Sequence, residues 1–301
     1  MANLRDLKDR IGSVKSTKKI TSAMKMVAAS KLRKAQEQAE DSQPYAVSMA
    51  HMLARVAQNV AQDNSGPRLL TGTGRDDTHL FVVVTSDRGL CGGFNANLVR
   101  QLRLEIQKVE AQGKTVKLVC AGRKGYDLLK RDMEGDILDR FVNIASSGNR
   151  IPFSEADKIA SFILDSFDDG VFDVCTVVYN EFQSVLVQKP RFQQLIPFQL
   201  PINDDNEEQQ TDEQGPISPY EFEPDEDEIL GKLLPKNFGI QIFRALLDSA
   251  AGEQAARMTA MDNATRNAGD MIDNLTLQYN RERQAAITNE LIEIISGAEA
   301  L

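Results

Sequence analysis

The stretch of this chain that most resembles a site for chemistry runs from Thr85 to Asn95, with the sequence Thr-Ser-Asp-Arg-Gly-Leu-Cys-Gly-Gly-Phe-Asn. It follows a short apolar run, contains three glycines and leads into a segment with helical spacing. Backbone N–H groups at the start of a helix bind phosphate, so one interpretation is a nucleotide site. The spacing matches neither the P-loop pattern nor G-x-G-x-x-G. We favour a structural turn whose glycines permit positive φ or a close approach of the backbone.

The thiol within this stretch, Cys91, lacks an evident general base. His51 lies in an N-terminal helical segment and His79 precedes the apolar run. Cys91, Cys120 and Cys175 are far apart and sit in or beside apolar runs, which predicts buried thiols and suggests neither a zinc site nor a disulfide. The histidines and the acidic residues show no metal-ligand spacing. We therefore identify no catalytic residue, metal ligand or cofactor site.

Charge is distributed unevenly along the chain, whose formal net charge is -9. The first 35 residues carry ten basic and two acidic side chains, whereas the segment between Arg191 and Lys232 contains no basic residue and twelve acidic ones. A basic start could bind nucleic acid, but no aromatic residue precedes Tyr45 and an apolar seam already follows one face. We favour a basic surface that faces acidic protein loops, and a solvated loop for the acidic segment.

The sequences at the two ends of the chain predict long helices that pack together. These helices must hold in place any surface through which the chain contacts another molecule. At the C-terminal end, apolar and small side chains recur at steps of three and four, the heptad pattern of helices that pack together. These residues are Met258, Met261, Thr265, Ala268, Ile272, Leu275 and Tyr279. A helix of about sixty residues would extend roughly 90 Å, so it needs a partner.

The N-terminal segment is the expected partner. Its seam begins with Leu4, Leu7, Ile11 and Val14, and we predict that it then shifts by three residues to Thr17, Ile20, Met24 and Val27. Helix-forming residues continue to Val60, and Pro44 is expected to kink or divide this helix. Because the middle of the chain must return to the rod, we expect the two terminal helices to pair in antiparallel fashion.

The middle of the chain predicts an α/β domain with a mostly parallel sheet, because apolar runs alternate with helical patterns. The expected strands are Leu80–Thr85, Val116–Ala121, Ile137–Val142, Val171–Tyr179 and Ser184–Gln188; the expected helices are Asn95–Gln112, Tyr126–Lys130 and Ser154–Phe167. The predicted organisation is a coiled-coil helix over 1–62, an α/β domain over 63–200, an acidic linker over 201–228 and a second coiled-coil helix over 229–301.

No run of the chain reaches the ~18 apolar residues that a membrane helix needs. The N-terminus, Met-Ala-Asn-Leu-Arg-Asp, resembles neither a signal peptide nor a transit peptide. From these features we expect a cytoplasmic protein.

Three stretches together resemble the γ subunit of F-type ATP synthases. They are Ile20–Lys31 (ITSAMKMVAASK), Val84–Asn95 (VTSDRGLCGGFN) and Ile287–Ala298 (ITNELIEIISGA), and they span most of the chain. The resemblance implies an antiparallel coiled coil of the terminal helices with a Rossmann-like α/β domain at its base. The implied role is the non-catalytic rotor shaft of a proton-driven ATP synthase, held at the cytoplasmic face of the bacterial inner membrane through the complex alone.

The resemblance also implies partners and contact residues. The partners are the alpha3-beta3 hexamer, the epsilon subunit and the c-ring. Met24 and Arg33 match positions that face the β lever region, and Arg283 and Gln284, next to Arg281, match a contact with a β catch loop. The apolar end, with Leu291, Ile294 and Ile295, matches a tip held by the α and β subunits, and Tyr220 and Glu223 match the foot on the c-ring.

Two other classes of protein remain open on the residues alone. One is an α/β nucleotide-binding enzyme with a coiled-coil dimerisation rod. The other is a nucleic-acid-binding coiled coil that uses the basic N-terminal segment. The acidic stretch from Asp204 to Pro216 has no assigned role in any of these interpretations.

Overall fold

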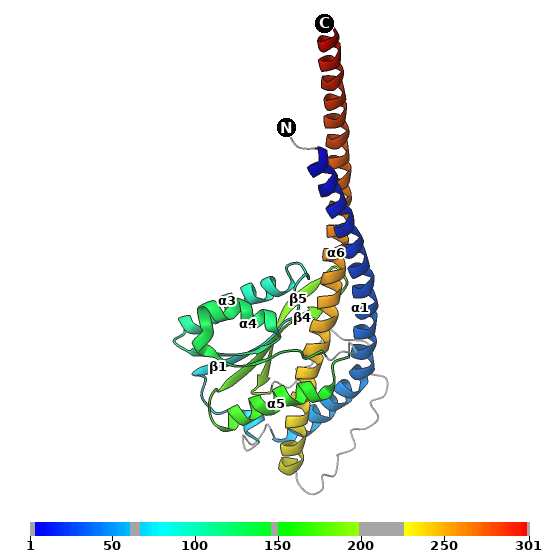
Figure 1. Cartoon of the computed structure of the whole chain (residues 1–301). Coiled ribbons are helices and arrows are strands. Elements are labelled where there is room, and N and C mark those ends of the chain that lie inside the picture. Colours follow the sequence, from blue (N-terminus) through cyan, green and yellow to red (C-terminus); the bar gives the residue numbers. More distant parts are fainter. Residues whose placement is uncertain (1–3, 61–66, 146–149, 199–225, 300–301) are drawn as a thin grey trace.

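The computed structural model consists of a long rod of two helices with an α/β domain on one side of its lower half (Figure 1). The structure describes residues 4–60, 67–145, 150–198 and 226–299. The rod is made by α1 (Leu4–Val60) and α6 (Glu226–Glu299). They run antiparallel, as predicted, and the C-terminal part of α6 projects beyond the start of α1.

The α/β domain contains a five-stranded sheet in the order β3-β2-β1-β4-β5, of which only β5 is antiparallel to its neighbour. The strands are β1 (Thr78–Val84), β2 (Thr115–Ala121), β3 (Ile137–Phe141), β4 (Val174–Phe182) and β5 (Gln188–Ile196). The helices are α2 (Arg68–Thr71), α3 (Phe94–Ala111), α4 (Arg123–Met133) and α5 (Phe153–Asp168), with a 3-10 turn, η1, at Glu134–Asp136. This confirms the predicted α/β class and mostly parallel sheet.

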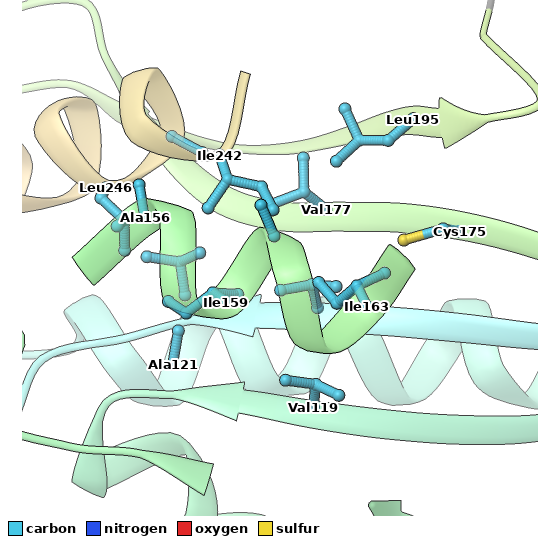
Figure 2. Close-up of a cluster of buried hydrophobic side chains, with 14 of the residues drawn as sticks. Val119, Ala121, Ala156, Ile159, Ile163, Cys175, Val177, Leu195, Ile242 and Leu246 are labelled. Atoms are coloured by element: carbon cyan, nitrogen blue, oxygen red, sulfur yellow. The ribbon is translucent and has the colours of Figure 1, made fainter. Parts of the chain in front are cut away.

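Helices bury both faces of the sheet, which explains why β1 is a continuous apolar run. On one face, Phe81 and Val83 pack in a cluster with Leu98 of α3 and Leu129 of α4. The other face packs against α5 and α6, as shown for Ile159 and Ile163 of α5 and Ile242 and Leu246 of α6 (Figure 2). The rod helix α6 is therefore part of the core of the α/β domain.

The prediction of a strand over Ser184–Gln188 was wrong. These residues form the turn of the β4–β5 hairpin, where the N–H groups of Gln183 and Ser184 donate to the carbonyl of Val187. The strand begins at Gln188 and passes through Pro190, which pairs with Asn180. The predicted strand ends before this proline. An edge strand tolerates proline because one side of its backbone has no neighbour to bond.

The two prolines in the rod do not divide its helices. The sequence predicts that Pro44 kinks or divides the first helix, and division does not occur, since α1 is one helix through Pro44. α6 is likewise one helix through Pro235. Packing on both sides offsets the lost backbone hydrogen bonds. The flanking residues form a buried cluster at the base of the rod, composed of Ala46, Met49 and Leu53 from α1 and Leu230, Leu234 and Ile240 from α6.

α6 begins at Glu226, so residues 226–228 of the predicted linker are helical. The rest of the acidic segment, including residues 204–216, lies outside the described residues. The four-part division of the chain stays a prediction.

The seam of α6 follows the predicted heptad, but the predicted shift in the seam of α1 was wrong. Instead of moving to Ile20 and Val27, which are 59% and 55% exposed, the seam continues in step through Thr21, Ala28 and Leu32, which are 8%, 1% and 5% exposed. Burying Ile20 and Val27 would contribute ~2 kcal/mol each. The shift would also put the helix out of step with the buried layers at either end of it, such as those of Leu7 and Leu32.

Adjacent residues on α1 provide a test of this seam. We expect Ala28→Asp to destabilise the full chain by about 3 kcal/mol, because it buries an unpaired carboxylate against α6. Val27→Asp makes the same change on the outer surface and should stay within about 0.5 kcal/mol of wild type. Urea unfolding followed by the helical circular dichroism signal measures both. A larger loss for Val27→Asp would contradict the seam described here.

Candidate functional site

The glycine-containing loop Thr85–Gly93 joins the α/β domain to the rod. Within the loop, Leu90 and Gly92 have positive φ angles of 67° and 59°. The side chain of Asn95 holds the loop together from the first turn of α3: its Oδ1 accepts from the N–H of Ser86 (3.0 Å), and its Nδ2 donates to Ser86 Oγ (2.7 Å) and Cys91 Sγ (3.3 Å). The polar groups at the start of the loop are thus bonded within the chain.

The same loop supplies hydrogen-bond partners for the start of α4. Thr85 Oγ1 accepts from the N–H of Gly125 (2.8 Å), the carbonyl of Ser86 accepts from the N–H of Lys124 (3.0 Å), and the Asp87 carboxylate accepts from the N–H of Arg123 (3.0 Å). A carboxylate beside a helix N-terminus is also favoured by the helix dipole. These polar side chains cap a helix, which supports the structural interpretation of the motif.

The close approach of the loop to α4 requires a glycine at position 122. Gly122 has a φ of 113°, and a Cβ atom there would lie 2.1 Å from the backbone oxygen of Thr85. No side chain fits at that distance, so this glycine is required by the packing of two backbones.

In α/β folds of this kind, ligands bind where the strand order reverses, outside the carboxyl ends of the strands. Here that position lies between β1 and β4, and α6 packs across it. A Cβ atom on Gly252 of α6 would lie 3.1 Å from the Phe94 ring and 3.7 Å from the carbonyl of Asn180. A groove of about 440 Å³ remains beside α6, lined by polar side chains that include Asn97, Arg100 and Asn263. The rod thus takes much of the space in which the nucleotide-binding alternative would place its ligand.

An ion pair on α6 completes the joint between the domain and the rod. Arg257 Nη2 lies 2.6 Å from Glu253 Oε1, and the two side chains are only 11% and 17% exposed. The same nitrogen donates to the carbonyl of Gly89 at 3.2 Å. Burial raises the pKa of Glu253, and the charge of Arg257 opposes this effect. The guanidinium is therefore the counter-ion of Glu253, and it also holds the loop on the rod.

The cysteines are buried, as the sequence indicated. Burial raises the pKa of Cys91 above its ordinary value and that of Cys120 to about 12. Both thiols are therefore protonated at neutral pH and poor nucleophiles. Among the described residues, no cluster of His, Cys, Asp and Glu side chains could hold a metal ion, and no helix is long and apolar enough to cross a membrane.

The candidate contact residues lie on the outer surface of the rod, and the structure does not gather them into one site. Arg33 is exposed, and its Nε lies 3.0 Å from Glu37 Oε1 on the same helix. Met24 is half-buried. Arg281, Arg283 and Gln284 are exposed on α6. Leu291, Ile294 and Ile295 are 54–68% exposed near the end of α6, together with Ile292. Tyr220 and Glu223 lie outside the described residues.

A long antiparallel helix pair, with an α/β domain built around the same helix, defines a class of rod-shaped scaffold subunits. Comparison with known proteins narrows the class. The family model described as ATP synthase matches residues 3–301. The ATP synthase gamma chains of Sinorhizobium medicae and Rhodospirillum rubrum are each 55% identical to this chain, and each match covers the full length of both proteins.

Solved structures show the same fold. A chain from the central stalk and c-ring structure of Tetrahymena thermophila mitochondrial ATP synthase is 26% identical, with a TM-score of 0.59 over 81% of this chain and 99% of that one. A chain from the Euglena gracilis mitochondrial enzyme gives a TM-score of 0.66 over 99% and 94%, at 19% identity. The chain belongs to the ATP synthase gamma-chain family, whose members are non-catalytic subunits of the central stalk.

Sequence reasoning missed the joint between the domain and the rod. Glu253 and Arg257 stand four residues apart, a spacing that puts two side chains on one face of a helix. That spacing is also common among exposed pairs, so nothing in the sequence distinguishes this buried pair from an exposed one.

The buried pair predicts a large effect of removing one partner. Arg257→Ala should destabilise the full chain by roughly 3 kcal/mol, since it leaves the Glu253 carboxylate buried without a counter-ion. Adding Glu253→Gln to this variant should recover part of the loss. Arg266→Ala removes an exposed pair with Asp262 at the same spacing and should cost less than about 1 kcal/mol. Denaturation midpoints compare the three, and equal losses for the two arginine variants would refute a buried joint.

Proposed function

We propose that this chain is the rotating shaft that couples proton flow to ATP synthesis. Its base would sit on the c-ring beside the epsilon subunit, and its rod would stand inside the alpha3-beta3 hexamer. One shaft cannot fit three equivalent subunits in the same way at once. Each orientation would therefore stabilise a different set of conformations of the catalytic sites, which are carried by the other subunits.

The observation that carries this proposal is the continuity of α6. The helix supplies Ile242 and Leu246 to the core of the α/β domain and continues without a break to the far end of the rod. Torque applied at the base would have to pass into α6, because the domain cannot turn without this helix. The loop of Thr85–Gly93 and its bond to Arg257 add a second attachment above that core.

The exposed end of α6 supports a surrounding partner. One hydrogen-bonded pairing near this end of the rod, Thr21 with Thr265, has an Oγ1–Oγ1 distance of 2.8 Å. Continuing this antiparallel register puts the start of α1 opposite about residue 282 of α6. Beyond it, four large apolar side chains between Leu291 and Ile295 are exposed. An apolar helix end that does not pair with another helix should be buried against another protein, and we propose that the α and β subunits bury it.

The proposed contact residues follow from exposure and chemistry. Arg283 and Gln284 project from the unpaired part of α6 and could form charge-assisted hydrogen bonds with a β loop. Arg33 and Met24, on α1, would face the β lever region. Tyr220 and Glu223 would form the foot on the c-ring. We place the chain at the cytoplasmic face of the bacterial inner membrane, attached through the complex.

The contact of α6 with the ring can be tested by truncating its polar side chains. We expect Arg283→Ala or Gln284→Ala to lower coupled ATP turnover by about tenfold, because each removes up to two charge-assisted or amide hydrogen bonds. The isolated subunit should keep its stability, since both side chains are exposed. The control is Arg266→Ala, which removes an exposed arginine from the part of α6 that pairs with α1. Unchanged turnover in both variants would reject these two residues as contacts.

The partners can be identified without any substitution. Mass spectrometry of proteins that co-purify with the tagged full chain from native membranes should detect the alpha, beta, epsilon and c subunits. A chain that is recovered only as a homodimer would contradict the proposal and favour the enzyme with a dimerisation rod. Calorimetry with ATP distinguishes that alternative further, because only the enzyme is expected to bind nucleotide through its α/β domain.

A further inference from the structure

The first helix of the rod contains two competing seams that differ by a single residue. One consists of Lys18, Thr21, Lys25 and Ala28, and the other of Thr17, Ile20, Met24 and Val27. Because consecutive residues of an α-helix are about 100° apart, a rotation of α1 by that angle would exchange the two sets. The second seam is the more apolar, and hydrophobic burial alone would favour it.

The structure uses the first, more polar seam. Thr21 and Ala28 are buried against α6, whereas Ile20 and Val27 are 59% and 55% exposed. Hydrophobic burial favours the second seam, yet the first seam is the one that faces α6. Some other interaction must therefore outweigh the gain from burying Ile20 and Val27. The contacts across the rod at this level supply it.

Three contacts between α1 and α6 occur at this level. Thr265 Oγ1 donates to Thr21 Oγ1 at 2.8 Å, and it also lies 2.7 Å from the carbonyl of Met261. Lys25 Nζ lies 2.6 Å from Asp262 Oδ1. The Lys18 side chain extends over Gly269, where a Cβ atom would come within 3.2 Å of the ammonium nitrogen. Each contact depends on one particular rotation of α1.

We infer that the polar layer formed by Thr21, Lys25, Asp262 and Thr265 fixes the rotation of α1 against α6 and so selects which face of α1 points outward. These are positioning residues. Thr21 is buried in the seam, and Lys25 and Asp262 pair at its edge with side chains 45% and 36% exposed. Polar contacts across a coiled coil have this effect because they have few acceptable partners, whereas apolar side chains pack against one another in many alignments.

The selection has a consequence for the outer surface of the rod. In the observed rotation Ile20 and Val27 lie outward, and Met24 lies at the edge of the seam. In the other rotation these side chains would be buried and the lysines would take their place. The inference about rotation does not depend on the proposed function; only the use of this apolar surface for contact with the ring does.

Paired cysteines can report the rotation in the full-length chain purified in its complex. Thr21→Cys with Thr265→Cys should form a disulfide under mild oxidation, since the native oxygens are 2.8 Å apart. Ile20→Cys with Thr265→Cys should form one only in the alternative rotation. The three native cysteines are buried and should not compete. The ratio of the two cross-links, measured on the linked peptides by mass spectrometry, is the readout.

We expect Lys25→Asp to lower the ratio of the Thr21 to the Ile20 cross-link about fivefold, because it replaces an ion pair with two facing carboxylates. The charge-swapped variant, Lys25→Asp with Asp262→Lys, should restore most of the ratio. Restoration should be incomplete, because Arg266 lies 3.4 Å from Asp262 and would repel the positive charge that the swap puts at this position. A structural defect unrelated to the charge pair would not be rescued by the swap.

Lys19→Asp is the matched control. It makes the same charge change on a face of α1 that does not contact α6, and it should leave the ratio unchanged. Lys25→Gln provides a milder variant if Lys25→Asp does not assemble, with an expected decrease of about twofold. The inference is overturned if the ratio is unaffected by Lys25→Asp and Lys25→Gln, or if Lys19→Asp lowers it equally.

Discussion

The structure depends on one helix that belongs to two cores. The first half of α6 packs Ile242 and Leu246 under the sheet, and the same helix pairs with α1 from Leu234 at the base to Thr265 higher up the rod. Because the packing of a protein interior is as dense as a crystal, the domain and the rod cannot move independently at this helix. A linker between two separate domains would absorb rotation, whereas a shared helix transmits it. The stiffness that the proposed function requires thus arises from the sharing of α6.

Periodicity predicted most of the fold, because burial imposes it on the sequence. The parallel strands appeared as apolar runs, and the seam of α6 appeared as a heptad that the burial pattern follows. The seam of α1 could not be predicted in the same way, since residues 17–28 contain two overlapping patterns. Hydrophobicity points to Ile20 and Val27, but continuity with Leu7 and Leu32, and polar contacts supplied by α6, favour Thr21 and Ala28. The choice depends on a partner 240 residues away in the sequence.

The glycine-containing loop shows how a motif that resembles a phosphate site can have a structural purpose. Its spacing matches none of the known nucleotide motifs, and the structure shows which contacts its polar residues make within the chain. Asp87 caps α4, Asn95 binds the loop to itself, and Gly89 offers its carbonyl to Arg257. None of these partners could be read from the sequence, because each comes from a different element.

The surface of the rod has the properties expected of a part that must turn inside another protein. Its cationic and amide side chains, such as Arg33, Arg283 and Gln284, are long, exposed and without strong partners in this chain among the described residues. Single contacts of this kind contribute little and exchange readily with water. Exposed apolar residues occur along the rod, as at Ile20 and Val27, and four more between Leu291 and Ile295 lie close together near the end of α6. At that end a tight contact would lie near the proposed axis of rotation and would oppose turning least. A surface with weak contacts along its length and apolar contact at its tip would hold the shaft in place and still let it rotate.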